Sequence, residues 1–145
     1  MFVERGAPIN NTNKYGNTPL MRVAYRGNLE IVRYLTELGA DVNIPENNSH
    51  TALHRAVESG NVDIIKLLLD KGMFVNLTYA HYKTPLQVSA EFCHLEATKA
   101  LAERGAAISN TNKYRNTPLM RAAYRGELEI FRYLTQIGAD INFRD

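Results

Sequence analysis

The sequence predicts an all-α fold built from repeated pairs of short helices, and three observations carry that prediction. Similar segments recur every 33 residues, each headed by a threonine: Thr18, Thr51, Thr84 and Thr117. Glycines keep the same interval: Gly39, Gly72, Gly105 and Gly138. Between these markers the apolar residues recur with helical spacing. A fixed period of about 20 to 50 residues indicates a repeat architecture, in which each unit buries its apolar face against its neighbours.

The first helix of each unit is expected to begin just after the threonine. Threonine is a good N-cap, and Pro19, Pro85 and Pro118 follow at the first helical position, where a missing N–H is not needed. About two turns later comes Gly27 or its equivalent, a residue that can adopt the left-handed conformation that ends a helix.

The second helix is expected over "NLEIVRYLTELG", where Leu29, Val32 and Leu35 share one stripe and Gly39 ends the helix. The linking stretch "ADVNIPENNSH" is rich in Asn and Pro, as a tight extended turn should be. Helices this short are marginal alone, so the pairs should stack into a solenoid.

Composition limits the other possibilities. The chain has 145 residues, 45% of them hydrophobic, and a formal charge of +2, which by itself indicates no nucleic-acid or membrane partner. Cys93 is its single cysteine, no apolar run has the length of a membrane span, and Glu4 and Arg5 interrupt the place of a signal peptide. We therefore expect a cytoplasmic location, although a secreted effector acting in a host cytoplasm would share these features.

The chain resembles the ankyrin repeat family, whose unit carries "TPLHxAAxxG" and "LLxxGAxxN". The best match is "TALHRAVESG" with "LLLDKGMFVN". The resemblance implies a single domain with the end of a partial repeat at 1–12 and four repeats at 13–45, 46–78, 79–111 and 112–144. It also implies β-hairpin loops, first helices on a concave face and second helices on a convex back.

Both ends match internal positions of the repeat. "FVERGAPIN" at 2–10 resembles "LAERGAAIS" at 101–109, and the fourth repeat keeps the internal apolar pattern of Leu128, Phe131 and Leu134. Terminal repeats normally have a polar outer face. We therefore expect either a longer array or ends that another chain covers.

Residues that recur every 33 positions are expected to serve the scaffold, whereas exposed positions that vary between repeats are candidates for recognition. Glu30, Asp63, Glu96 and Glu129 occupy one position of the second helix, which indicates a solvated face. His54 stands where the family has a histidine that hydrogen-bonds neighbouring turns, so we assign it a structural role.

The remaining candidates for chemistry are His50, His81, Cys93 and His94. Cys93 and His94 lack a zinc spacing, and adjacent helical residues diverge by about 100°, which disfavours a Cys–His nucleophile pair. No glycine-rich phosphate loop is present. We predict no enzyme activity, no cofactor and no metal.

Carrying over the positions that the family uses for recognition gives a candidate protein-binding surface on the loop tips and first helices. Its residues are Lys14, Tyr15, Asn17, Tyr25, Arg26, Asn48, His50, Glu58, His81, Lys83, Glu91, Phe92, Lys113, Tyr114, Asn116, Tyr124 and Arg125. Tyrosine and arginine are enriched at binding hot spots. Basic and aromatic residues in the first and fourth repeats flank Glu58 and Glu91.

The first and fourth repeats are near copies. Residues 11–43 and 110–142 differ at seven positions, and the difference inside "NTNKYGNTPLMR" is Gly16 against Arg115. The third repeat departs most from the family, with small side chains at Ala97, Thr98 and Ala100. We expect Phe131 to fill that space, so that Phe131→Ala would cost about 3 to 5 kcal/mol.

The sequence thus favours a non-catalytic protein–protein interaction module, a scaffold or adaptor. Two alternatives stay open. One is nucleic-acid or nucleotide binding through Tyr, Arg and Lys, which the small net charge disfavours. The other is weak end-to-end self-association of an otherwise monomeric chain. The resemblance also implies that Asn43, Asn76 and Asn142 lie where asparaginyl hydroxylases modify some family members.

Overall fold

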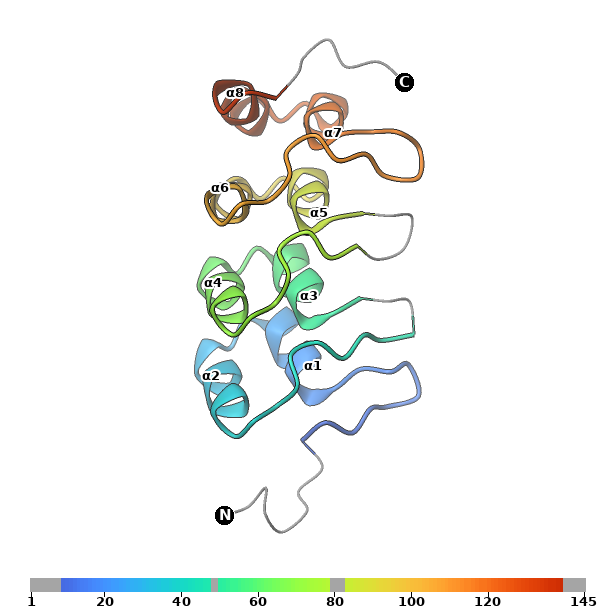
Figure 1. The fold of residues 1–145 in the computed structure, drawn as a ribbon, viewed down its shortest axis with the longest axis vertical. Helices are drawn as coiled ribbons and strands as arrows, with labels where there is room; N and C mark the ends of the chain where they lie inside the picture. The colour runs from blue at the N-terminus through green and yellow to red at the C-terminus, as the bar shows by residue number, and fades with distance from the viewer. Residues whose placement is uncertain (1–8, 48–49, 79–82, 140–145) are drawn as a thin grey trace. The chain divides into compact units, whose positions relative to one another are not determined.

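The computed structural model describes residues 9–47, 50–78 and 83–139, which contain eight α-helices in two compact units (Figure 1). Unit 1, Met1–Met73, holds the helices of repeats 1 and 2: α1 (Pro19–Arg26), α2 (Leu29–Glu37), α3 (Ala52–Ser59) and α4 (Val62–Asp70). Unit 2, Phe74–Asp145, holds those of repeats 3 and 4: α5 (Pro85–Glu91), α6 (Leu95–Glu103), α7 (Pro118–Arg125) and α8 (Leu128–Gln136). The predicted all-α repeat fold is confirmed.

The helix starts follow from the recurring threonines. Thr18, Thr84 and Thr117 have extended backbone, and each hydroxyl accepts a hydrogen bond from the N–H three residues on, at 3.2 Å. Such a cap satisfies a backbone donor that no helical carbonyl can reach, and it is worth about 1 kcal/mol.

The ends of the first helices depend on a left-handed residue. Gly27, Gly60 and Gly126 have φ values of 85°, 78° and 74°. In repeat 3, Cys93 takes the same conformation with φ 63°. A non-glycine residue in this conformation is strained by about 1 to 2 kcal/mol. The first helix of repeat 3 nevertheless ends in the same left-handed geometry as the others.

Within each unit the two repeats pack helix against helix. In unit 1, α1 packs against α3 and α2 against α4; in unit 2, α5 packs against α7 and α6 against α8. The fully buried side chains of this packing are those of Leu20, Met21, Leu53, Ile64, Ile65, Leu68, Leu86, Leu101, Ile130 and Leu134. This packing supplies the stability that such short helices lack alone.

Hydrogen bonds between loops add to the helix contacts. In unit 1 the Asn10 side chain accepts from the N–H of Asp41 at 2.9 Å, and in unit 2 Asn76 accepts from Ala107 at 2.8 Å. These asparagines are 66 residues apart, so the recurring asparagine has a structural role. Asn142 lies outside the described residues.

The inter-repeat loops form tight turns in the described residues. In the first loop the N–H of Asn13 donates to the carbonyl of Asn17, and the Asn13 side chain accepts from the N–H groups of Tyr15 and Asn17. Asn112 forms the same turn in repeat 4. The turn geometry thus comes from asparagine side chains bonding their own backbone.

The expected packing of Phe131 is wrong. Phe131 is partly exposed and lines a pocket with residues of its own repeat, whereas Ile130 and Leu134 are the fully buried residues of α8. The small Thr98 is instead accommodated by polar contacts: its hydroxyl lies 2.8 Å from that of Ser89 and donates to the carbonyl of His94. The substitution Phe131→Ala should therefore cost much less than the loss expected for a buried aromatic ring.

Candidate protein-binding surface

The predicted surface residues divide into two groups with different surroundings. Repeats 2 and 3 carry charged residues that pair within the chain. Repeats 1 and 4 carry exposed tyrosines beside Lys and Arg.

In repeat 2 the charged residues form a network between the loop and α3. Arg55 contacts Glu46 at 2.5 Å and Glu58 at 2.8 Å, and His50 lies 2.7 Å from Glu46 and 3.4 Å from Glu58. The side chains of His50 and Glu58 are only 14% and 10% exposed. Sequence reasoning missed Glu46 and Arg55; the signal was that Glu46 replaces the turn-forming Asn13 and Asn112.

The network shifts the pKa values of Glu58 and Arg55. Burial raises the pKa of Glu58, but hydrogen bonds from His50 and Arg55 outweigh it, so the pKa lies below its ordinary 4.5. Burial lowers the pKa of Arg55, and the hydrogen bonds to Glu46 and Glu58 outweigh it, so the pKa is raised. Both shifts favour the charged forms, as expected for groups paired at short distance.

In unit 2 a second set of ion pairs joins repeat 3 to repeat 4. Lys83 lies 2.8 Å from Glu91, and Arg121 of α7 lies 3.6 Å from the other oxygen of that carboxylate. Arg121 also stacks over the ring of Tyr124, at 5.2 Å from the centroid. Glu58 and Glu91 are thus both paired with cationic side chains of their own unit, so neither presents an unpaired negative charge.

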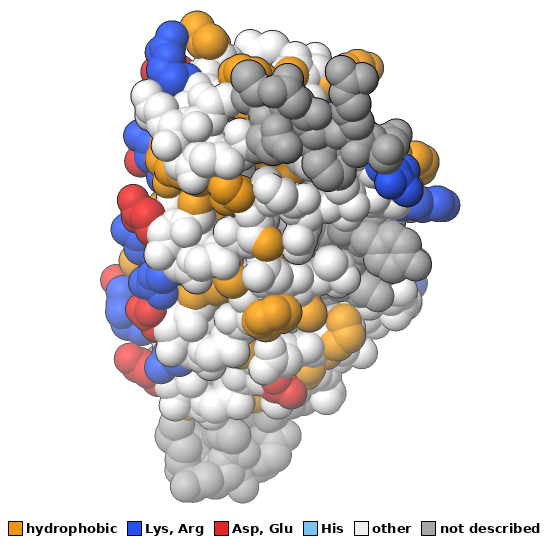
Figure 2. Space-filling model, turned by 45° about the horizontal axis from the view of Figure 1, so that its top comes forward, with side chains coloured by type: hydrophobic (Ala, Val, Ile, Leu, Met, Phe, Trp, Pro, Cys, Tyr) orange, Lys and Arg blue, Asp and Glu red, His pale blue; other side chains and the backbone are white. Residues whose placement is uncertain are grey.

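The tyrosines of repeats 1 and 4 are the large exposed side chains of this surface. Tyr15 and Tyr25 are 58% and 53% exposed, and Tyr114 and Tyr124 are 60% and 79% exposed. Lys14 and Lys113 lie over the rings of Tyr15 and Tyr114 at 5.1 and 5.9 Å. At the upper right of Figure 2, on the loop side of unit 2, Lys or Arg side chains lie beside hydrophobic ones.

The other residues of the predicted surface differ in their exposure and contacts. Asn17 and Asn116 are half-buried, and the carbonyl of Asn116 accepts from the Gln87 side chain at 2.9 Å. Phe92 is 44% exposed and stacks on His94 with 6.4 Å between ring centroids. Asn48 and His81 lie outside the described residues.

A sequence comparison with protein families decides what kind of chain this is. The model of a family described as ankyrin repeats (3 copies) matches residues 1–79 and again residues 76–145. The chain belongs to the ankyrin repeat family. No curated protein matches it. Ankyrin repeats are generally non-enzymatic protein–protein interaction modules.

The histidine at the ankyrin position is buried at the start of α3, where it bonds its own N-cap residue. His54 is fully buried, and its Nδ1 lies 3.0 Å from the hydroxyl and 3.3 Å from the N–H of Thr51. In repeat 3 Gln87 takes this place, accepting from the N–H of Thr84 and donating to the carbonyls of Asn110 and Asn116. Both residues thus cap the start of their helix, and Gln87 also bonds the adjoining loop.

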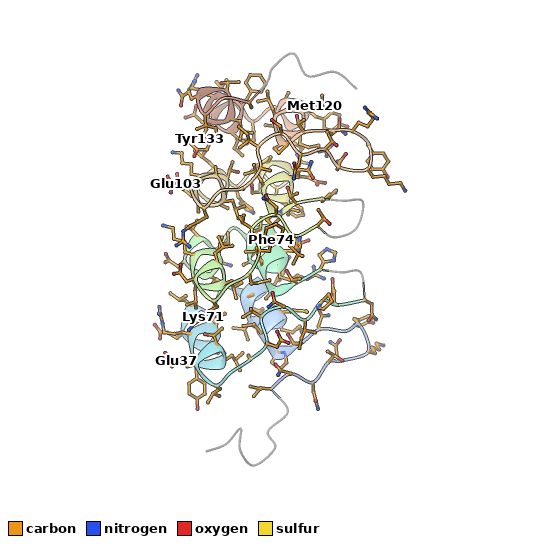
Figure 3. All side chains as sticks on the ribbon, viewed as in Figure 1. Glu37, Lys71, Phe74, Glu103, Met120 and Tyr133 are labelled. Atoms are coloured by element: carbon orange, nitrogen blue, oxygen red, sulfur yellow. The ribbon has the colours of Figure 1, made fainter. Side chains whose placement is uncertain are left out.

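The second helices of the ankyrin repeats carry a mixed charged surface. Glu30, Asp63, Glu96 and Glu129 are all exposed, and Glu129 pairs with Arg132 at 2.6 Å. Where α6 faces α8, Lys99 lies over the ring of Tyr133 at 5.8 Å. Burial and the charge of Glu103 raise the pKa of Tyr133; Figure 3 labels both residues.

Neither a metal site nor a membrane span is found in the parts of these ankyrin repeats that the structure describes. No group of three or more His, Cys, Asp or Glu side chains there could hold an ion. None of the helices in the same residues is long and apolar enough to cross a bilayer.

Proposed function

We propose that this chain is a non-catalytic protein-binding module, a scaffold or adaptor, whose contacts are made by the tyrosine and cationic residues of repeats 1 and 4. The observation that carries the proposal is the exposure of Tyr15, Tyr25, Tyr114 and Tyr124, each more than half exposed and each in a repeat that supplies cations nearby. Tyrosine offers a large rigid contact area with a polar handle, at a small loss of conformational entropy on binding.

The partner we propose is a protein segment that carries carboxylates. In the described residues, no carboxylate pairs with the four cations that accompany the tyrosines: Lys14, Arg26, Lys113 and Arg125. In the middle repeats the carboxylates of this surface are already paired: Glu46 and Glu58 with Arg55, and Glu91 with Lys83 and Arg121. The charge left for a partner on this surface is therefore positive.

The test is affinity capture from native cell extract, followed by titration of the purified partner. The bait is the 145-residue chain, compared with a variant carrying Tyr25→Ala, Arg26→Ala, Tyr124→Ala and Arg125→Ala. Because hot-spot truncations each cost above about 1 kcal/mol, we expect the variant to bind at least about tenfold more weakly. A matched control, Arg33→Ala with Lys66→Ala, removes exposed cations from second helices and should bind like wild type.

Equal binding by the four-substitution variant and the wild type would contradict this assignment. Loss of binding in the control as well would point to a general charge effect. Both variants should keep the far-ultraviolet circular dichroism of the wild type, since the altered side chains are exposed.

Nucleic-acid binding is the second candidate, favoured by the same juxtaposition of cations and tyrosines. Single-strand binders combine basic residues with aromatic rings on which bases stack. A single-stranded oligonucleotide would then bind with an affinity that falls steeply and linearly in log units with salt. Absence of binding at low salt eliminates this candidate.

A further inference from the structure

The near-identical repeats 1 and 4 bury opposite sides of the same helix pair. In repeat 1 the side of α2 toward repeat 2 is covered: Val32 is 0% exposed, whereas Ile31 is 44% exposed. In repeat 4 the pattern reverses: Ile130, the equivalent of Ile31, is 0% exposed, and Phe131, the equivalent of Val32, is partly exposed. One sequence thus shows both sides of the helix pair.

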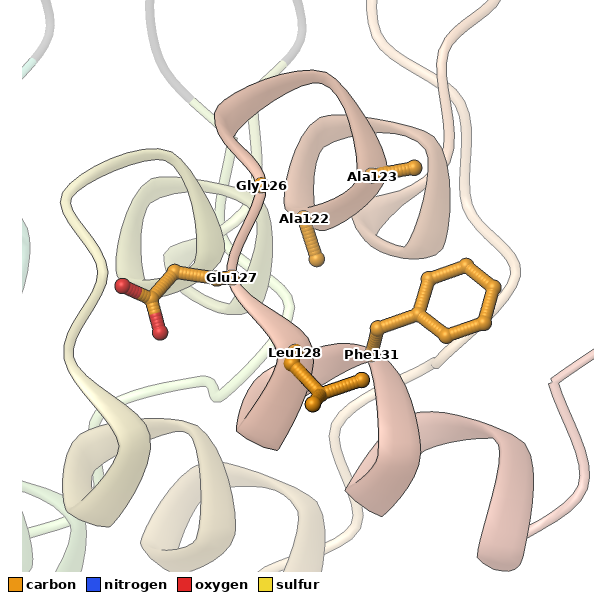
Figure 4. Close-up of a pocket in the computed structure, with 6 residues that line it drawn as sticks. All are labelled: Ala122, Ala123, Gly126, Glu127, Leu128 and Phe131. Carbon is orange, nitrogen blue, oxygen red and sulfur yellow. The ribbon is translucent and has the colours of Figure 1, made fainter.

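The uncovered side of repeat 4 is an apolar surface, here called the trailing face, formed by Ala123, Leu128, Phe131 and Ile137. Leu128 is 60% and Ile137 39% exposed. A pocket of about 210 Å³ opens between α7 and α8, lined by Ala122 and Ala123 of α7 and by Leu128 and Phe131 of α8 (Figure 4). In repeat 1 the equivalents Ala24 and Val32 are buried by repeat 2.

The uncovered side of repeat 1, here called the leading face, is formed by Ile31, Tyr34 and Leu35. Its aliphatic residues match those that repeat 2 uses to cover repeat 1, since Ile64 and Leu68 stand at the equivalent positions and are 1% and 0% exposed. The leading face therefore has the side chains that, one repeat later, pack against a surface like the trailing face.

A cation–ring contact inside unit 2 has equivalent residues on the two uncovered faces. Where α6 meets α8, Lys99 lies over the ring of Tyr133. The position of Lys99 is occupied in repeat 4 by Arg132, and that of Tyr133 is occupied in repeat 1 by Tyr34, which is 57% exposed. A leading face placed on a trailing face would bring this cation and this ring together.

We propose that the trailing face of repeat 4 binds the leading face of repeat 1 in a second copy of this chain. The contact is heterologous, because the two faces differ, so each bound copy still offers one free face and association can continue. The proposal is separate from the partner-binding surface on the loops and first helices, and the variants that test the two do not overlap.

The loops would contribute less to this contact than they do inside unit 1. There the N–H of Asn47 donates to the carbonyl of Tyr15 at 3.1 Å, beside Gly16. A Cβ on Gly16 would lie 2.8 Å from that nitrogen. Repeat 4 has Arg115 at this position with the same left-handed backbone, φ 66°. Its side chain keeps a following loop from approaching in the same way, so the association is confined to helices and is weak.

The test measures the mass of the chain by light scattering or sedimentation from micromolar concentration to about 1 mM. Wild type should rise above its monomer mass of 16.4 kDa as concentration increases. Leu128→Glu destroys the trailing face and Ile31→Glu the leading face, so each variant alone should stay monomeric. An equal mixture of the two should form a 1:1 complex and nothing larger, because each retains the face that the other lacks.

Two further variants keep the test decisive. Arg115→Gly removes the obstacle in the loop and should tighten association about fivefold, the equivalent of one added hydrogen bond. Lys66→Glu, at an exposed site on α4, should associate like wild type. The proposal is overturned if wild type stays monomeric throughout, if Leu128→Glu still associates alone, or if the folded variants fail to pair on mixing.

Discussion

Repeats 1 and 4 share all but seven of 33 aligned residues, yet they differ in which residues are buried. Ile31 is exposed while its copy Ile130 is buried, and Ala24 is buried while its copy Ala123 is exposed. The difference arises because repeat 1 is covered by repeat 2, which follows it, whereas repeat 4 is covered by repeat 3, which precedes it. In a repeat protein, burial is therefore a property of the stack rather than of the local sequence.

The same comparison explains the difference between Gly16 and Arg115. Gly16 adjoins the loop of repeat 2, where a Cβ would lie 2.7 Å from the Asn47 side chain and 3.0 Å from the Cα of Glu46. Arg115 is exposed. The backbone is left-handed at both, but only repeat 1 also requires that no side chain be present.

The largest effect should distinguish the two isoleucines. Ile130→Ala removes a fully buried side chain and should lower the free energy of unfolding by about 2 to 5 kcal/mol. Ile31→Ala, the same change at an exposed copy, should cost less than about 1 kcal/mol. Urea denaturation of both variants measures the difference, and equal losses would show that the burial pattern is not as described.

The second effect exchanges the loop residues. Gly16→Arg should destabilise the chain by about 2 to 4 kcal/mol, because it adds left-handed strain to a clash with the backbone of repeat 2. Arg115→Gly should stabilise it by at most about 1 kcal/mol, because only the strain is relieved. Thermal unfolding checks both; a neutral Gly16→Arg would mean that the two loops do not pack closely.

The third effect concerns the buried polar residue of repeat 3. Gln87→Met places there the residue that repeats 1 and 4 carry, and it removes the hydrogen bonds to the carbonyls of Asn110 and Asn116. We expect a loss of about 1 to 3 kcal/mol, because two hydrogen bonds donated by a fully buried side chain would disappear. The matched control, Met120→Gln, changes a partly exposed site and should have a smaller effect on the urea midpoint.

The smallest effect is a pH dependence. The folded pKa of Glu58 lies below its unfolded value, so its contribution to stability is present above pH 4.5 and is lost as pH falls through the folded pKa. In the Glu58→Gln variant, the loss of stability that comes from protonating Glu58 at acid pH should be absent. Urea midpoints measured from neutral pH to acid pH for both proteins would show it, and parallel profiles would refute the shift.

Much of the fold could be predicted from the sequence, because its determinants are local. Thr18 and its copies start helices and Gly27 and its copies end them, whatever lies around them. The packing of Phe131 could not be predicted, because the period fixes equivalent positions but not the side on which a neighbour lies.

The candidate binding surface could likewise be predicted only in part. The exposed tyrosines could be found, because they stand at loop and helix-end positions. The pairing of Glu58 and Glu91 could not be found, because their partners Arg55, His50, Lys83 and Arg121 lie at other spacings and meet them only in the folded units.

The most direct test of the proposed binding surface is site-specific photo-crosslinking in native cell extract, with the crosslinking residue at Tyr124 or at Lys66. The first is on the proposed surface and the second is exposed on a second helix. We predict a discrete protein adduct from Tyr124 that excess wild type suppresses and the four-substitution variant does not. The same adducts from both positions, or none from Tyr124, would contradict the account.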